Sequence, residues 1–177
     1  LKIAYGYGIR IIQLTYNYRN SAGDGCAERN QAGLSNYGFD LVEKMNDLGI
    51  LVDLSHTGDS STMDAIEHSK DPVSFTHTLP RATTPRELSD FAKWNNKYMF
   101  YGGWSDYALR RAKTDEQIKA CAEKGGVIGI TPFFAKKAGD STLTDDLLDQ
   151  IDYAVELVGG KHVGFGSDVD FNSTLDR

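Results

Sequence analysis

Two histidines and one aspartate stand at the ends of short apolar runs in the sequence. His56 ends the run GILVDLSH, His77 ends PVSFTH, and Asp168 ends HVGFGSD. Neutral imidazoles and carboxylates are common ligands of divalent zinc in proteins. For either histidine alone, the competing interpretation is a hydrogen bond to a neighbouring loop. The three residues together favour a metal site.

Each of these runs has the pattern of a strand buried in a parallel sheet, a nearly continuous stretch of branched residues. The carboxyl ends of parallel strands lie along one edge of a sheet, and in barrel enzymes this edge carries the chemistry. We therefore expect His56, His77 and Asp168 to converge on one rim. His68, on a polar helix end, and His162, at the start of a strand, are predicted to be structural or solvated.

Further polar residues and glycines lie close to these three in the sequence. Asp168 and Asp170 alternate on one predicted strand end, so both would point the same way. Asp168 is the predicted ligand, and Asp170 is expected to orient a histidine. Asp53 lies inside an apolar strand, where a carboxylate needs partners; it is expected to support a histidine or to make a plain hydrogen bond inside the sheet. Gly164 and Gly166 leave room for close approach of backbone or ligand.

Strand-like and helix-like segments alternate five times along the chain. Thr114 and Gln117 form a Thr-x-x-Gln capping box, which predicts where one helix begins. Gly49 is a plausible helix stop. The predicted strands are 9–14, 49–56, 72–77, 127–131 and 162–168. Five helices are predicted. The first ends near residue 8, the second runs from Ser35 to Gly49, and the third passes through Met63 to about Ser69. The fourth runs from Thr114 to Lys124, and the fifth covers 142–158.

This alternation predicts an α/β fold with parallel strands and right-handed crossovers. A (β/α)8 barrel and a doubly wound sheet both fit, and the barrel is favoured because the candidate ligands come from several strand ends. A complete barrel usually needs about 250 residues. We therefore expect residues 1–177 to form a single incomplete (β/α)8 TIM barrel domain that lacks its first strands. An aromatic-rich excursion at about 79–113 is either a surface cluster or a lid over the site.

Composition excludes several classes of function. The chain has 177 residues, 40% of them hydrophobic, and a net charge of -6, so it offers one core and no basic surface for nucleic acid. No apolar run approaches the roughly 20 residues of a membrane helix. No phosphate-binding loop and no nucleophile elbow occur. Cys26 and Cys121 lie far apart, which predicts reduced thiols and favours a cytoplasmic location. The chain begins without Met, so we expect a part of a longer protein whose targeting segment, if any, lies elsewhere.

In combination, several motifs resemble the membrane dipeptidase (renal dipeptidase) family of zinc peptidases, in its bacterial form. The resemblance spans nearly the whole chain apart from about residues 82–110. It is carried by residues 8–17, 23–26, 33–35, 45–56, 75–77, 113–117, 125–130 and 164–170. It implies a (β/α)8 barrel with two zinc ions bridged by a glutamate, of which this chain is the C-terminal part.

The resemblance also implies roles for individual residues. His56 and His77 would bind one zinc ion, and Asp168 would bind the other. The family's remaining ligands, a His-x-Asp pair and the bridging Glu, precede the stretch that matches this chain. Tyr16 stands where the better-known animal enzymes have a histidine that contacts the substrate, and it would stabilise the oxyanion. Arg111 would hold the substrate carboxylate. The alternatives to Arg111, left open by an insertion, are Arg110 and Arg86.

The implied activity is hydrolysis of the peptide bond of dipeptides by a zinc-bound hydroxide, with Tyr16 and Asp168 as catalytic residues. The expected partner is a small dipeptide, and a homodimer is the candidate assembly. Two alternatives stay open. One is a non-catalytic barrel or assembly component without a complete metal site. The other is a related barrel hydrolase that acts on cyclic amides or lactones.

Overall fold

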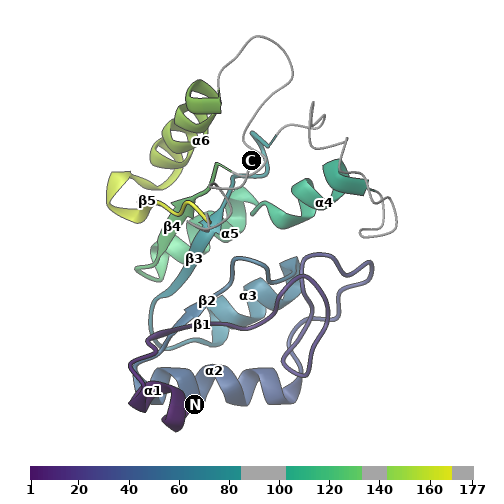
Figure 1. Ribbon diagram of the computed structural model, residues 1–177, viewed down its shortest axis with the longest axis vertical. Coiled ribbons are helices and arrows are strands. Elements are labelled where there is room, and N and C mark those ends of the chain that lie inside the picture. The colour runs from purple at the N-terminus through teal and green to yellow at the C-terminus, as the bar shows by residue number, and fades with distance from the viewer. Residues whose placement is uncertain (85–102, 133–142, 169–177) are drawn as a thin grey trace, which may run out of the picture.

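A five-stranded parallel sheet runs through the molecule in the order β1-β2-β3-β4-β5 (Figure 1). The computed structural model describes residues 1–84, 103–132 and 143–168, with the backbone alone at 103–105. The strands are β1 (Ile11–Gln13), β2 (Leu51–Asp53), β3 (Val73–Thr78), β4 (Val127–Ile130) and β5 (Val163–Phe165). Neighbours in space are therefore neighbours in sequence, as in one arc of a barrel wall.

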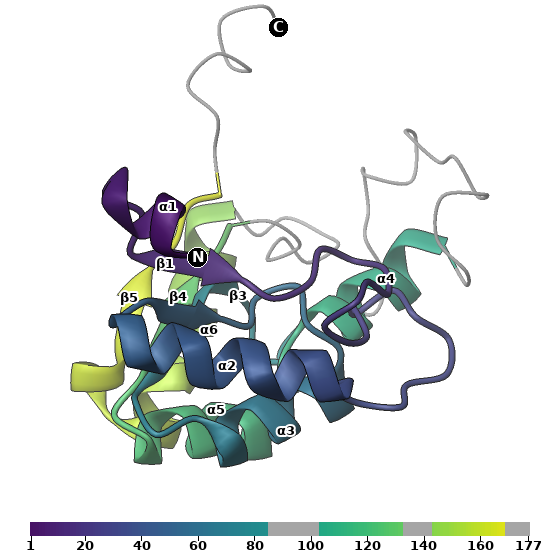
Figure 2. The same cartoon turned by 90° about the horizontal axis from the view of Figure 1, so that it is seen from below.

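The helices connect the strands and lie mainly on one side of the sheet. Figure 2 shows α2, α3 and α5 together on one side of the strands. The bounds are α1 (Lys2–Gly6), α2 (Asn36–Leu48), α3 (Asp59–His68), α4 (Gly103–Arg111), α5 (Asp115–Glu123), α6 (Leu143–Val158) and the 3-10 turn η2 (Gly160–His162). None of the described helices has the length and apolarity that crossing a bilayer requires.

Local signals in the sequence set the ends of two helices. The Ser35 side chain accepts a hydrogen bond from the Gly38 amide at the start of α2, and Gly49 ends that helix with φ 66°. At the start of α5 the predicted capping box is confirmed: the Thr114 side chain accepts from the Gln117 amide, and the Gln117 side chain accepts in return. These contacts satisfy amides that the first helical turn leaves without partners.

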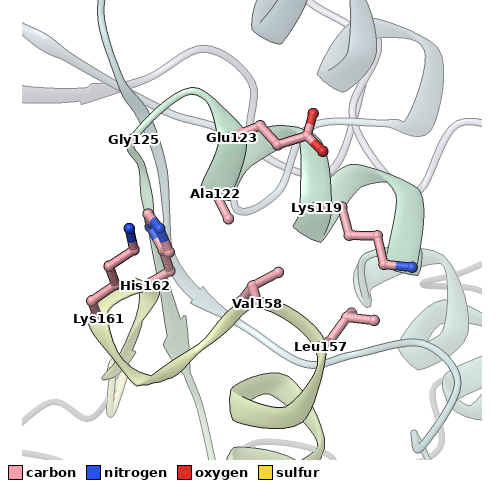
Figure 3. Close-up of a pocket in the computed structure, with 8 residues that line it drawn as sticks. All are labelled: Lys119, Ala122, Glu123, Gly125, Leu157, Val158, Lys161 and His162. Carbon is pink, nitrogen blue, oxygen red and sulfur yellow. The ribbon is translucent and has the colours of Figure 1, made fainter.

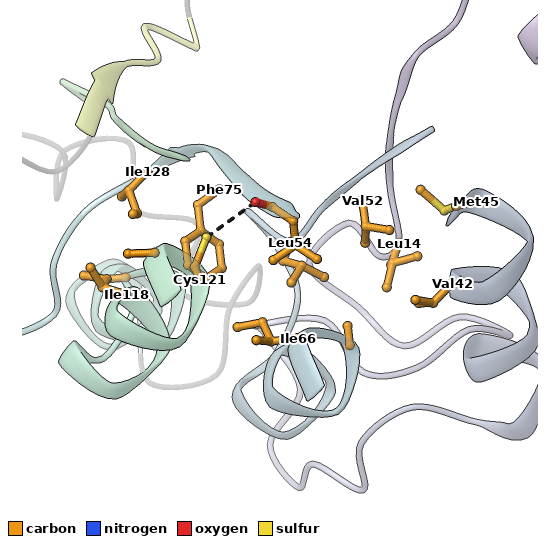
Figure 4. Close-up of a cluster of buried hydrophobic side chains, with 14 of the residues drawn as sticks. Leu14, Val42, Met45, Val52, Leu54, Ile66, Phe75, Ile118, Cys121 and Ile128 are labelled. Atoms are coloured by element: carbon orange, nitrogen blue, oxygen red, sulfur yellow. Dashed lines mark hydrogen bonds between the residues drawn. The ribbon is translucent and has the colours of Figure 1, made fainter. Parts of the chain in front are cut away.

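Alternation along the strands separates an apolar face from a polar one. Val52 and Leu54 are fully buried on the helix side, so Asp53 between them points to the opposite face. Figure 4 shows the apolar side as a continuous cluster in which Phe75 and Cys121 pack together between the sheet and α5. The Cys121 thiol lies 3.6 Å from the Val73 carbonyl. This core fixes the strands whose ends carry the polar residues.

The excursion after β3 is closed at its base. The Lys113 amide donates to the Leu79 carbonyl at 2.9 Å, and the Arg81 amide donates to the Lys113 carbonyl at 2.7 Å. Arg81 also holds Asp59 of α3 with two N–H groups, at 2.7 and 2.9 Å. Several aromatic residues of the excursion lie outside the described residues: Phe91, Trp94, Tyr98, Phe100 and Tyr101. The choice between lid and surface cluster therefore stays a prediction.

The predicted α/β class is confirmed, but helix α4 lies within the stretch predicted as an excursion, and β2 and β5 are shorter than expected. β2 ends at Asp53, so the prediction that His56 is the last residue of a strand is wrong, and His56 lies in the turn that follows. β5 ends at Phe165, three positions before Asp168. Asp168 has φ 53°, a left-handed backbone that a strand does not accommodate. The prediction that Asp168 belongs to a strand is therefore wrong, and Asp170 lies outside the described residues.

Candidate metal centre

The structure brings His56, His77 and Asp168 together at the carboxyl ends of three strands: His77 is near the end of β3, and His56 and Asp168 each lie three positions beyond β2 and β5. The two Nε2 atoms of the histidines lie 3.1 Å apart. His77 Nε2 lies 3.7 Å from Asp168 Oδ1. One ligand atom from each of the three residues lies within 4.8 Å of the others. Among the described residues, this is the group of ligand-type side chains that is close enough to hold one ion.

The spacing of these atoms fits zinc. Tetrahedral zinc with bonds of about 2.0–2.1 Å to nitrogen places two imidazole nitrogens about 3.3 Å apart. The separation of 3.1 Å between the two Nε2 atoms is close to this value. Two nitrogens and one carboxylate oxygen also form a donor set that zinc accepts. The residues present therefore suit the ion that the sequence predicted.

The surroundings favour the neutral form of both imidazoles, which is the form that binds metal. Burial lowers the pKa of His56 to about 2, and the charge of Arg111 adds to this effect. Burial and Arg111 also lower the pKa of His77, although Asp168 acts in the opposite direction. Protons therefore compete weakly with a cation for the two Nε2 atoms.

His56 is held by a contact that the sequence did not indicate. Its Nδ1 lies 2.6 Å from Asn17 Oδ1, and the same oxygen accepts the Tyr107 hydroxyl at 2.7 Å. Asn17 has φ 63°, a strained backbone region that in proteins is often associated with functional sites. Tyr16, next to it, is 70% exposed and stacks on the His56 ring with centroids 4.3 Å apart. Its predicted position beside the site is thus consistent with the structure.

The His77 side of the site is supported by a buried carboxylate. Asp53 Oδ1 accepts from the amides of Ser55 and Thr76 and from the Ser55 hydroxyl, at 2.6–3.1 Å. Asp53 Oδ2 accepts the Thr76 hydroxyl at 2.8 Å. Thr76 Oγ1 lies 2.8 Å from His77 Nδ1, and Ser55 Oγ accepts the His77 amide at 3.1 Å. Asp53 therefore has its partners, and they lead to a histidine of the site.

Of the two candidate arginines that the structure describes, Arg111 is the one beneath the site. It is 6% exposed, and its guanidinium donates to the carbonyls of Ser55 and His77, the latter at 2.7 Å. Arg110 points elsewhere, to the Ala27 carbonyl at 3.1 Å. Arg86 lies outside the described residues.

The remaining histidines and the surface pocket lie away from this centre. His162 Nδ1 lies 2.8 Å from the Gly126 carbonyl, at the amino end of β5. His68 lies 3.3 Å from Glu43. Figure 3 shows His162 at the edge of a pocket between α5 and the end of α6, and none of the three candidate ligands lines that pocket. These contacts are consistent with the prediction that His68 and His162 are structural or solvated residues.

A protein-family model matches residues 1–90 and 106–175 of the chain. The family is described as membrane dipeptidase (peptidase family M19). The match leaves out 15 residues of the excursion, between 90 and 106.

Individual relatives agree with that match. A Schizosaccharomyces pombe protein named as an uncharacterized dipeptidase is 32% identical over 96% of this chain, which spans 37% of the yeast protein. The crystal structure of an amidohydrolase from Pseudomonas aeruginosa is 35% identical, with a TM-score of 0.76, over 96% of this chain and 45% of that chain.

A third comparison concerns the fold. A metallopeptidase from Rhodobacter sphaeroides, solved with a phosphinate mimic of the dipeptide L-Ala-D-Ala, is 22% identical with a TM-score of 0.74. The likeness covers 96% of this chain and 45% of that one. The chain thus spans less than half of both of these solved relatives, as expected for a partial barrel.

Proposed function

Because the chain belongs to the membrane dipeptidase family (peptidase family M19), we propose that its metal centre serves the hydrolysis of dipeptides with zinc as cofactor. The observation that carries this proposal is the meeting of His56, His77 and Asp168 within 4.8 Å. In a barrel, a site at the carboxyl ends of the strands is the place where catalysis is found.

The two histidines would hold one zinc ion through their Nε2 atoms, and Asp168 would contribute to a second ion. When bound, zinc supplies Lewis-acid chemistry: it polarises a carbonyl oxygen and makes water acidic enough to act as a nucleophile near neutral pH. The chain's own residues then orient the substrate. Tyr16, exposed above His56, would donate its hydroxyl to the oxyanion that forms from the peptide carbonyl.

Arg111 would attract the carboxylate of a dipeptide. A guanidinium carries five N–H groups, and two of them bind the strand-end carbonyls of Ser55 and His77. The charge is thereby fixed beneath the strand ends, and its remaining N–H groups would donate to the carboxylate. A fixed cation next to the metal centre favours short substrates, because it places the terminal carboxylate near the reacting bond.

A homodimer in a reducing compartment belongs to the same proposal. Cys26 and Cys121 are both buried and unpaired, which supports a reducing environment. Sedimentation of the full-length protein tests the dimer, and a purely monomeric protein would remove that part of the proposal.

The test compares histidine variants of the full-length protein. We expect about two zinc ions per complete protein and cleavage of dipeptides. Removing a residue that hydrogen-bonds a metal ligand typically lowers metal affinity or activity 10- to 100-fold. Loss of the ligand itself in His77→Ala should therefore lower dipeptidase activity by more than about 100-fold. His162→Ala is the matched control, because that ring binds the Gly126 carbonyl at the other end of the sheet.

Two outcomes would overturn the proposal. One is a full-length protein that binds no zinc, which would favour a non-catalytic barrel. The other is a protein that cleaves cyclic amides or lactones in a substrate panel and leaves dipeptides intact. The second outcome has a specific basis, because the solved Pseudomonas relative is called an amidohydrolase.

A further inference from the structure

A chain of hydrogen bonds joins a buried carboxylate to the ring of His77. Thr76 Oγ1 lies 2.8 Å from Asp53 Oδ2 on one side and 2.8 Å from His77 Nδ1 on the other. A threonine hydroxyl has one proton to donate and lone pairs with which to accept. The direction of that one proton therefore decides which nitrogen of the imidazole carries hydrogen.

The surroundings settle this direction. Asp53 accepts only N–H and O–H donors in the structure, including two backbone amides. The Ser55 hydroxyl gives its proton to Asp53 Oδ1 at 2.6 Å, which leaves Ser55 no proton for Thr76. A carboxylate is a stronger acceptor than a neutral hydroxyl or imidazole. Thr76 therefore donates to Asp53 and must accept its other hydrogen bond from His77 Nδ1–H.

A neutral imidazole carries one N–H, so a proton on Nδ1 leaves the lone pair on Nε2. That Nε2 is the atom that faces His56 Nε2 at 3.1 Å and Asp168 Oδ1 at 3.7 Å. His56 has the same arrangement, because Asn17 Oδ1 accepts a hydrogen bond from His56 Nδ1–H at 2.6 Å. Both rings thus present a lone pair to the same point.

We infer that Asp53, acting through the Thr76 hydroxyl, is a positioning residue that fixes the metal-binding tautomer and ring orientation of His77. This role rests on the proposed function, because it gives His77 a cation to bind. Asp53 touches neither the ion nor the substrate. Its contribution is to remove the competing tautomer, in which the proton on Nε2 would block coordination.

The experiment measures zinc affinity by competition with a chromophoric chelator in the full-length protein. Thr76→Val keeps the shape of the side chain and removes the hydroxyl, so zinc affinity should fall about 10- to 100-fold. Thr76→Ser retains the hydroxyl and should restore affinity. Thr78→Val is the matched control on the same strand, because the Thr78 hydroxyl faces the Arg111 carbonyl at 3.5 Å. Asp53→Asn should lower affinity as Thr76→Val does.

A second measurement needs neither zinc nor activity. Nitrogen-15 NMR of labelled histidines in the metal-free protein should show His77 protonated at Nδ1, with a loss of this preference in Thr76→Val. Equal zinc affinity in Thr76→Val, Thr78→Val and the parent protein would overturn the inference and leave the proposed function intact. If the parent protein binds no zinc, the proposed function fails. The NMR result then decides alone, and a His77 protonated at Nε2 would contradict the inference.

Discussion

Two basic side chains, Arg111 and Lys113, are buried beneath the strand ends that carry the histidines. Arg111 binds two strand-end carbonyls, and Lys113 donates to the Thr57 carbonyl at 2.6 Å and to the Thr62 hydroxyl at 3.2 Å. At the scale of single residues, this positive charge helps to keep the imidazole of His56 neutral. It is held in place by hydrogen bonds to backbone carbonyls, so its cost of burial is partly offset.

Lys113 gives a prediction about stability and pH. Burial, followed by the charge of Arg111, lowers its pKa to about 7, against 10.5 for the lysine reference. Between these two values the unfolded chain binds more protons than the folded one, so the free energy of unfolding should rise with pH. From pH 7 to pH 9 the rise attributable to this group is about 2 kcal/mol. The Lys113→Met variant should not show this rise in the free energy of unfolding.

The check is denaturant unfolding of both proteins at several pH values between 7 and 9. Lys119→Met is the control, because Lys119 is an exposed lysine on the adjoining helix α5 and should leave the pH dependence as it is. A Lys113→Met protein whose stability follows the same pH curve as the parent would show that Lys113 is not the group responsible.

At the scale of elements, the close approach of the segment after β5 to the end of β3 depends on one glycine. A Cβ at Gly166 would lie 1.9 Å from the Thr76 carbonyl oxygen. The Gly166 amide also donates to the Ile130 carbonyl at 3.0 Å, which holds the end of β5 against β4. Gly164 differs, since its nearest neighbour would be a Val127 methyl at an ordinary 3.5 Å. The predicted close approach therefore applies to Gly166 and is not required at Gly164.

This difference predicts unequal effects of two similar substitutions. Gly166→Ala forces the segment after β5 away from the Thr76 carbonyl of β3 and should cost about 1–3 kcal/mol, the usual penalty for overpacking. It should also weaken zinc binding, because Asp168 follows two residues later. Gly164→Ala should change stability by about 0.5 kcal/mol or less. Thermal unfolding and zinc titration of both variants provide the measurement, and equal behaviour of the two would contradict the account.

At the scale of the whole molecule, the sheet has two outer strands, β1 and β5, and apolar side chains remain exposed near both. Ile3 and Tyr7 near β1 are 79% and 85% exposed, and Phe165 at the end of β5 is 63% exposed. Exposed strand edges and apolar patches of this kind favour association with further chain. The solved relatives, of which this chain spans about half, contain such additional chain.

We therefore expect the 177-residue chain by itself to be inactive and to self-associate. It offers three of the ligands that the resemblance implies, and among the described residues β1 and β5 each pair with one strand of the sheet. Analytical ultracentrifugation and a dipeptide assay with added zinc test both points, with the full-length protein as the control. Zinc-dependent hydrolysis by the isolated, monomeric chain would refute this expectation.

The sequence by itself determined the elements apart from α4, and it identified the three candidate ligands. Ser35, Gly49 and the Thr114 capping box act over a few residues, so their pattern is readable without a fold. The apolar runs before His56 and His77 identify buried parallel strands, and the shared edge of such strands follows from topology. The resemblance to a family added the roles of Tyr16 and Arg111, which no local pattern carries.

Only the tertiary structure decided how the site is held. Asn17 meets His56 across 39 positions of sequence and Tyr107 across 90, and Thr76 meets Asp53 across 23. No periodicity or cap links such distant residues, because hydrogen bonds of this kind exist only once the strands are side by side. The left-handed backbone at Asp168 likewise depends on how the chain leaves β5. Local forces fix the strands and helices, whereas packing between them fixes which nitrogen and which oxygen face the candidate metal site.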